Sequence, residues 1–132
     1  MTKALRRHIE MQPLDLERGW EALPGFPDGL EVKVLADDLN ELRKTGARTR
    51  LVRFAPGAAT EAPLMHDYWE EVFLLNGELA QVGDESPVAE RLAYSCRPPG
   101  TPHGPFISAA GCVMLELQYY GAVTNISRLT TS

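Results

Sequence analysis

The chain has 132 residues, of which 44% are hydrophobic and 23% charged, a composition typical of one ordinary globular domain and unlike that of a disordered chain. The formal net charge of −5 argues against nucleic-acid binding, which usually needs a basic stripe on the surface. No apolar run approaches the roughly 20 residues of a membrane span, and no apolar stretch follows the basic N-terminal residues as in a secretory signal. We therefore expect a cytoplasmic protein with neither nucleic-acid nor membrane partners.

Residues 1–28 show little sign of regular structure, because Pro13, Pro24 and Pro27 restrict any helix to a short turn. We interpret this segment as an irregular N-terminal arm that packs on the following domain. The domain itself is expected to span residues 29–132.

Beyond the arm, glycines and prolines recur at short intervals and separate short apolar runs, a pattern that favours an all-β fold. Strands are predicted over residues 31–36, 48–54, 62–66, 70–75, 78–82, 90–96, 103–107 and 112–120. The pair Asn76-Gly77 lies between two of these runs and predicts a β-hairpin there. Residues 37–44 fit either a short helical turn or a loop. Short strands at this spacing indicate a small single-domain β-barrel or jelly roll.

The segment HDYWEEVFLL, which begins at His66, holds the first candidate metal ligands. If this segment is extended, its side chains alternate, so that His66, Tyr68 and Glu70 share one face and Glu71 lies on the other. A histidine and a carboxylate on the inner face of a small barrel can reach one cation, which favours Glu70 over Glu71. A turn near Asp67 would break the alternation and reverse that choice. Tyr68 could serve as a catalytic acid–base group, or could simply pack in the barrel mouth with its hydroxyl in water.

His103 lies in the segment RPPGTPHGPF, whose prolines stiffen the backbone. A rigid backbone suits a metal ligand, because the ligand must be held in place before the ion arrives. The alternative is a proline-rich surface loop in which the histidine is incidental. The remaining histidine, His8, lies in the arm beside two arginines and is expected on the surface.

Two predicted strands carry polar side chains that could reach the interior of a barrel. Arg48 and Arg50 share one face of the strand 48–54 and could bind a carboxylate or enolate substrate, although a solvated strand face is the simpler interpretation. Glu116 and Gln118 share one face of the strand 112–120, which could line a cavity or face solvent.

These residues carry a resemblance to the cupin superfamily, whose fold is a small β-barrel. The first cupin motif, Gly-x(5)-His-x-His-x(3,4)-Glu-x(6)-Gly, is matched in this chain by Gly57, His66, Glu70 and Gly77. The second motif, Gly-x(5)-Pro-x-Gly-x(2)-His-x(3)-Asn, is matched by Pro98, Gly100 and His103. The segments TRLVRFAPGA, EEVFLLNGEL and PHGPFISAAGCVMLEL further resemble the ChrR-like cupins. That branch includes the metal-binding domain of certain anti-sigma factors and lies close to acetylacetone-cleaving and dihydroxyacetophenone-type dioxygenases.

The chain also departs from both motifs. Leu64 stands where the first motif has its first histidine, and the gap that follows Gly57 is one residue longer than the pattern. Leu92 and Ile107 stand where the second motif has glycine and asparagine. What the resemblance implies is a metal site with three protein ligands: His66, Glu70 and His103.

Two histidines and one carboxylate form the facial triad of non-haem iron(II) oxygenases, so that one divalent metal ion is expected, with Fe(II) favoured and Zn, Mn or Ni as alternatives. A degenerate site with little metal affinity is the contrary interpretation. The resemblance implies a dioxygenase that cleaves a small dicarbonyl or hydroxyketone. Two other functions stay open: a redox-neutral isomerase or lyase with Tyr68 as the proton-transfer group, and a non-catalytic metal- or ligand-binding sensor of ChrR type. A homodimer is expected, because the arm and strand 31–36 would otherwise leave an exposed strand edge.

Overall fold

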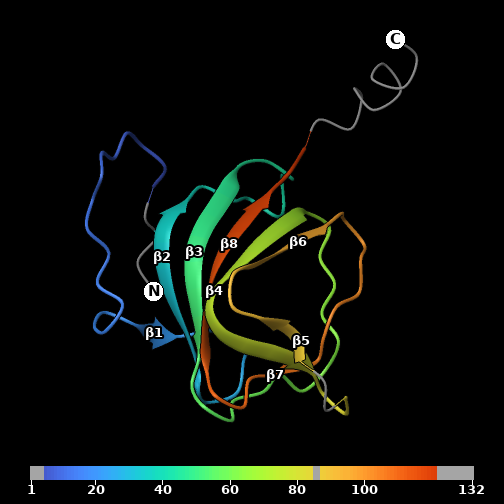
Figure 1. Cartoon of the computed structure of the whole chain (residues 1–132). Coiled ribbons are helices and arrows are strands. Elements are labelled where there is room, and N and C mark those ends of the chain that lie inside the picture. The colour runs from blue at the N-terminus through green and yellow to red at the C-terminus, as the bar shows by residue number, and fades with distance from the viewer. Residues whose placement is uncertain (1–4, 85–86, 122–132) are drawn as a thin grey trace.

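The computed structural model describes residues 5–84 and 87–121, which form eight strands and no helix (Figure 1). The strands are β1 (Glu21–Ala22), β2 (Leu30–Asp37), β3 (Ala47–Phe54), β4 (Trp69–Gln81), β5 (Pro87–Glu90), β6 (Ala93–Arg97), β7 (Phe106–Ile107) and β8 (Cys112–Tyr119). The all-β fold predicted from the sequence is confirmed. Within the described ranges, no helix is long and apolar enough to span a membrane.

All strand pairs are antiparallel, and the spatial order β1-β2-β3-β8-β4-β5 differs from the order along the chain. Strand β8 therefore lies between β3 and β4, as in a jelly roll. The first half of β4 pairs with β6 and β8, while its second half pairs with β5 and β7. Figure 1 shows β4 curving from one group of strands into the other. This curvature closes most of the barrel around a central cavity.

The predicted hairpin at Asn76-Gly77 is wrong, because β4 runs through both residues without turning back. The register of β4 against β8 shifts between Leu74 and Asn76, which marks a β-bulge. Gly77 has a φ of 78°, and a Cβ atom there would lie 2.0 Å from the carbonyl oxygen of Gly111. A β-bulge and a tight turn can both require a residue that tolerates positive φ. Asn76-Gly77 is therefore compatible with either structure, and here it bends a long strand.

Three other predicted strands are shorter than expected. Residues 62–66 form no strand, and contribute only an isolated bridge between Leu64 and His103. The strand predicted over 103–107 is reduced to β7, and the run 90–96 is divided between β5 and β6. The losses at 62–66 and 103–107 coincide with Pro63, Pro102 and Pro105, which have no N–H group to donate to a neighbouring strand.

The N-terminal arm packs on the outer face of β2 and β3. Trp20 contacts two cations of these strands, with the Arg53 guanidinium 4.5 Å and the Lys33 ammonium 5.5 Å from the ring centre. Lys33 also donates to the backbone carbonyls of Asp15 and Arg18. Residues after β1 then cross to the other side of the sheet, where Leu23 joins the core.

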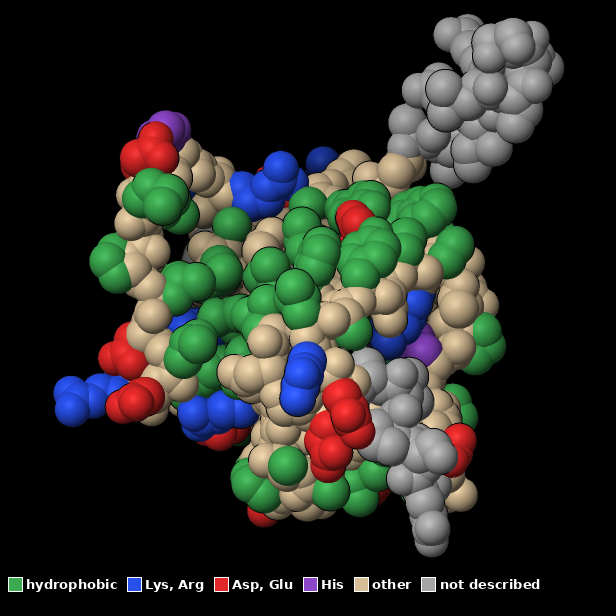
Figure 2. Space-filling model, in the orientation of Figure 1, with side chains coloured by type: hydrophobic (Ala, Val, Ile, Leu, Met, Phe, Trp, Pro, Cys, Tyr) green, Lys and Arg blue, Asp and Glu red, His purple; other side chains and the backbone are tan. Residues whose placement is uncertain are grey.

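Alternation along the strands divides their side chains between an inner and an outer face. The inner face forms a buried apolar core: Leu23, Leu30, Val32, Val52, Phe54, Val72, Leu74, Leu79, Cys112 and Met114. The outer face is also rich in apolar side chains, among them Leu75 and Tyr94, which are 40% and 53% exposed. Figure 2 shows hydrophobic side chains gathered on the surface over β3, β8, β4 and β6.

Candidate metal centre

A cavity of about 260 Å³ lies inside the barrel, between the inner faces of β3, β4 and β8 and the segments that connect the strands. One part of its wall is apolar, with Leu23, Phe26, Leu30, Leu79 and Phe106. Another part carries polar side chains: Arg48, Arg50, His66, Tyr68, Glu70, Arg97, His103 and Glu116. A concave apolar site with a few convergent polar groups is the usual form of a small-molecule site.

The three predicted ligands converge in this cavity. One donor atom from each of His66, Glu70 and His103 lies within 4.8 Å of the others. The Nε2 atom of His103 is 3.5 Å from Oε1 of Glu70, and the ring centres of the two histidines are 5.2 Å apart. Donor atoms at this spacing can bind one ion with only small side-chain movements.

Three different segments bring these side chains together. Glu70 comes from the start of β4, His66 from the segment before it, and His103 from the proline-rich segment before β7. A backbone bridge joins the last two segments, because Leu64 N–H donates to His103 O at 2.7 Å and His103 N–H donates to Leu64 O at 2.9 Å. The predicted rigidity around His103 thus comes from this bridge as well as from the prolines.

The predicted alternation holds from Leu64 to Glu70. Leu64, His66, Tyr68 and Glu70 all line the cavity. Glu71 lies on the outer face, where it accepts hydrogen bonds from the hydroxyls of Tyr94 and Tyr119. His8 does not line the cavity: it lies in the arm with its side chain 83% exposed.

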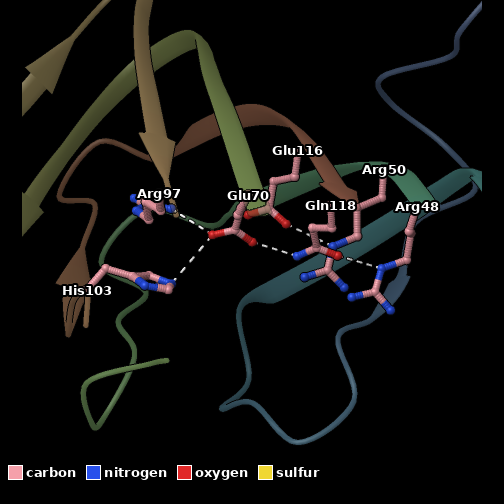
Figure 3. A network of polar contacts seen from close by, with 7 residues as sticks. All are labelled: Arg48, Arg50, Glu70, Arg97, His103, Glu116 and Gln118. Carbon is pink, nitrogen blue, oxygen red and sulfur yellow. Dashed lines mark hydrogen bonds and ion pairs between the residues drawn. The ribbon is translucent and has the colours of Figure 1, made fainter. Parts of the chain in front are cut away.

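Both oxygens of the Glu70 carboxylate are held by neighbouring side chains (Figure 3). Arg97 Nη1 donates to Oε1 at 2.7 Å, and Gln118 Nε2 donates to Oε2 at 2.6 Å. Gln118 Oε1 in turn accepts a hydrogen bond from Arg48 Nε at 2.6 Å. Outer hydrogen bonds of this kind fix the orientation of a metal ligand.

His103 is oriented by a carbonyl oxygen. Its Nδ1 atom is 3.1 Å from the carbonyl oxygen of Thr101, and because a carbonyl only accepts, Nδ1 must carry the proton. The Nε2 atom on the Glu70 side is then free to bind a metal ion.

The protonation states of the three residues also suit a metal site. Burial alone would raise the pKa of Glu70, but the hydrogen bond from Gln118 and the charge of Arg97 outweigh it and hold that pKa below its usual value. Burial lowers the pKa of His66 and that of His103. At neutral pH the set is therefore one carboxylate and two neutral imidazoles, the forms that bind metal ions.

The position of Arg97 opposes the binding of a metal ion. Its guanidinium bonds to Oε1 of Glu70, the same oxygen that faces His103. An ionised carboxylate has about four lone-pair positions, so Glu70 retains acceptor capacity beyond the bonds from Arg97 and Gln118. The donor set therefore fits a divalent ion, with a positive charge beside it that reduces the affinity.

Tyr68 lies against the candidate ligands. Its ring stacks on the His66 ring with centres 4.7 Å apart and planes inclined by 8°. Tyr68 is 4% exposed, and burial raises the pKa of its hydroxyl to about 12. The hydroxyl stays protonated at neutral pH, so it can donate a hydrogen bond to a ligand, but its raised pKa makes it a weak acid and it is not available as a base.

Four further polar residues complete the site, and the sequence identified them incompletely. Arg48 and Arg50 line the cavity, so the simpler interpretation of a solvated strand face is wrong for both, while Arg53 on the opposite face pairs with Glu31. Arg50 Nε lies 2.8 Å from Glu116 Oε1, and burial raises the pKa of Glu116 in spite of this partner. Sequence reasoning missed Arg97 altogether, because its place opposite Glu70 depends on the register between β4 and β6.

An antiparallel jelly roll with two histidines and a glutamate converging in its interior defines a cupin. The chain belongs to the family of ChrR cupin-like domains, whose family model matches residues 15–120. No curated protein sequence matches the chain.

Several solved structures share the fold. The acetylacetone dioxygenase from Acinetobacter johnsonii is 18% identical, with a TM-score of 0.64 over 94% of this chain and 87% of that one. The polyketide cyclase RemF from Streptomyces resistomycificus is also 18% identical, with a TM-score of 0.60 over 83% and 80% of the two chains. The anti-sigma ChrR, in complex with Rhodobacter sphaeroides SigE, is 18% identical, with a TM-score of 0.57 over 79% of this chain and 50% of that one. At these identities the likeness shows the fold alone.

Proposed function

We propose that this cupin is a metal-dependent enzyme, and specifically a non-haem iron dioxygenase that cleaves a small dicarbonyl or hydroxyketone. The observation that carries the proposal is the convergence of donor atoms from His66, Glu70 and His103 within 4.8 Å of one another. Fe(II) is the favoured ion, because two imidazoles and one carboxylate are the ligands of that class of oxygenase. Zn, Mn and Ni are the alternatives.

The residues of the chain would have distinct roles in this activity. His66, Glu70 and His103 hold the ion, which when bound supplies Lewis-acid chemistry and a template for substrate and dioxygen. Thr101 and Gln118 orient two of these ligands through the hydrogen bonds described above. Tyr68 is the candidate proton donor. A cavity of about 260 Å³ with partly apolar walls has room only for a small molecule.

Oxygen uptake by the Fe(II)-loaded protein with acetylacetone as substrate tests this proposal. We expect one equivalent of dioxygen to disappear with each equivalent of substrate, since oxidative cleavage of a carbon–carbon bond consumes oxygen. Glu71→Ala is the matched control, because Glu71 adjoins Glu70 but lies on the outer face. Loss of substrate without oxygen uptake would instead support the redox-neutral isomerase or lyase, to which the fold of the polyketide cyclase RemF lends support.

A second candidate function is a ligand-binding sensor module, as in the ChrR alternative. The observation that favours it is the bond from Arg97 to Glu70, which already provides a positive charge to pair with that carboxylate. If Arg97 replaces the metal, the protein purified without added metal should be metal-free, and Arg97→Met should gain metal affinity. If the first proposal holds, the wild-type protein already contains stoichiometric metal by elemental analysis.

The homodimer, the cytoplasmic location and the division into an arm (1–28) and a barrel (29–132) stay proposals. Strand β1 pairs with β2 through Glu21 and Ala22 and so covers part of the edge that the predicted dimer would cover. The part of the β2 edge that β1 does not pair with could associate with a second copy of the chain, which supports the dimer proposal.

A further inference from the structure

Arg48 projects from the inner face of β3 toward the candidate metal centre. It lies directly across from Gln118 in the pairing of β3 with β8, and it lines the central cavity. Figure 3 shows Arg48 beside Arg50, with both side chains on the same side of the sheet as Glu70. Arg48 therefore lies on the inner face of the strand, where it borders this cavity and also a second hollow that Arg6 and Tyr119 line.

Arg48 differs from the other two cavity arginines in having no acidic partner. The Nε atom of Arg50 lies 2.8 Å from Oε1 of Glu116, and the Nη1 atom of Arg97 lies 2.7 Å from Oε1 of Glu70. Among the described residues, Arg48 forms no ion pair with any carboxylate. With these residues its side chain forms one hydrogen bond, from Nε to the uncharged Gln118.

The terminal nitrogens of Arg48 are consequently available to a ligand. Neither terminal nitrogen has a hydrogen-bond partner among the described residues. Every fully buried side-chain nitrogen or oxygen of these residues does have a partner. The terminal nitrogens must therefore be accessible. A guanidinium with both terminal nitrogens free is the group that binds a carboxylate through two parallel hydrogen bonds.

The charges that line the cavity also favour an anion. Three guanidinium groups, of Arg48, Arg50 and Arg97, face two carboxylates, of Glu70 and Glu116, so one positive charge is left uncompensated. A divalent ion at the three candidate ligands would add to this excess. In a partly enclosed cavity such an excess acts strongly on a bound molecule, because water screens it only weakly.

A chain of hydrogen bonds connects Arg48 to the candidate metal ligands. Because Arg48 can only donate, the Oε1 atom of Gln118 faces it, and the Nε2 atom of Gln118 faces Glu70. An anion on Arg48 would thus lie one amide side chain away from the Glu70 carboxylate. That separation suits one small molecule with its charged group at Arg48 and its reacting carbonyl near the metal centre.

From these observations we propose that Arg48 binds the carboxylate of a singly charged substrate, and that the enzyme takes a small keto acid in preference to a neutral diketone. This inference rests on the proposed function and specifies the class of substrate that the same site accepts. It assigns Arg48 the role of a specificity-determining residue.

Acetoacetate and acetylacetone are a suitable pair of probes, because they are similar in size and differ in a carboxylate against a methyl ketone. Binding of each to the metal-loaded protein and to chelator-treated protein is measured by isothermal titration calorimetry at neutral pH. Wild-type protein should bind acetoacetate more tightly than acetylacetone. Arg48→Met should weaken acetoacetate binding by about ten- to a hundredfold, as for a lost charge-assisted hydrogen bond, and should change acetylacetone binding by less than about threefold.

Two further variants separate a direct contact from a general effect. Arg48→Lys keeps the charge and should retain part of the preference for acetoacetate. Arg53→Met removes a charge from the same strand on its outer face, where Arg53 pairs with Glu31, and should leave both affinities unchanged.

Three results would overturn the proposal: wild-type protein with no preference for acetoacetate, wild-type protein that binds neither probe, or equal weakening of both probes in Arg48→Met. The last would mean that Arg48 only positions Gln118. The metal content of the same preparations tests the proposed function separately, since the preference for the anion is also read in chelator-treated protein.

Discussion

Arg50 and Glu116 show at the residue scale how this barrel accommodates charge in its interior. Their side chains are only 13% and 11% exposed, and they meet across neighbouring strands β3 and β8 at 2.8 Å. Removing water from two charges costs free energy that their attraction offsets only when both are present. The loss of one partner should therefore destabilise the folded protein.

Replacing Glu116 alone should destabilise the protein far more than replacing both partners. We expect Glu116→Leu to lower the free energy of unfolding by about 3–5 kcal/mol, because the Arg50 charge is left buried and unpaired. The double variant Arg50→Met/Glu116→Leu should recover most of that loss. Urea denaturation of the two variants measures the difference; a double variant no more stable than the single one would contradict this account.

Leu64 offers a second prediction, because it stands at the cavity wall where the cupin motif has a further histidine. Leu64→His should add a ligand and tighten metal binding by about tenfold or more, since even an indirect partner of a metal ligand can change affinity that much. The added ligand should also close an open position on the ion and so lower activity. Metal competition with a chelator measures the first effect. Unchanged affinity would mean that the side chain at position 64 does not reach the ion.

The positions of the candidate ligands could be predicted where the alternation of side chains along a single extended segment was sufficient. Alternation alone places His66, Tyr68 and Glu70 on one face and Glu71 on the other, and the structure has this arrangement. Arg97 could not be found in this way, because it meets Glu70 only through the register of two separate strands. The roles of these residues in metal binding and catalysis stay predictions.

At the scale of elements, β4 illustrates why local signals are ambiguous. The pair Asn76-Gly77 correctly signals a residue with positive φ, but local sequence does not say whether the chain turns back or bends onward. In the structure β8 pairs with β4 from Trp69 to Gly77, on both sides of the register shift, and the strand continues through the pair. The resulting bend carries β4 from one group of strands to the other.

Gly77→Ala should therefore be much more damaging than Gly83→Ala. Both glycines have positive φ, of 78° and 86°, so both substitutions incur the same backbone strain of about 1–2 kcal/mol. Only at Gly77 would the new Cβ meet a backbone atom, at 2.0 Å from Gly111 O, whereas nothing lies within 4 Å at Gly83. We expect Gly77→Ala to cost ~3 kcal/mol or more in unfolding free energy. Equal losses in the two variants would rule out the close contact as the cause.

At the scale of the whole molecule, composition and turn spacing were sufficient to predict an all-β domain, and the structure confirms it. The pairing of strands distant in sequence, such as β3 with β8, could not be predicted from spacing because it depends on how the sheets pack. Apolar side chains on the outer face, including the exposed Leu75 and Tyr94, provide additional surface for association (Figure 2).

Light scattering at micromolar concentration should give a mass twice that of the 14.6 kDa chain. The physical reason is that a homodimer would cover the part of the β2 edge left free by β1 and bury apolar surface now exposed to water. A mass equal to one chain under these conditions would contradict the predicted homodimer.

The central claim is that His66, Glu70 and His103 together hold one metal ion, and elemental analysis of ligand variants tests it most directly. With only three protein ligands, the loss of any one should leave too few bonds to retain the ion. Metal content should therefore collapse in His66→Ala, Glu70→Ala and His103→Ala, and should persist in Glu71→Ala and His8→Ala. Metal content that is unchanged in all five variants, or that is lost in Glu71→Ala and kept in Glu70→Ala, would contradict the account.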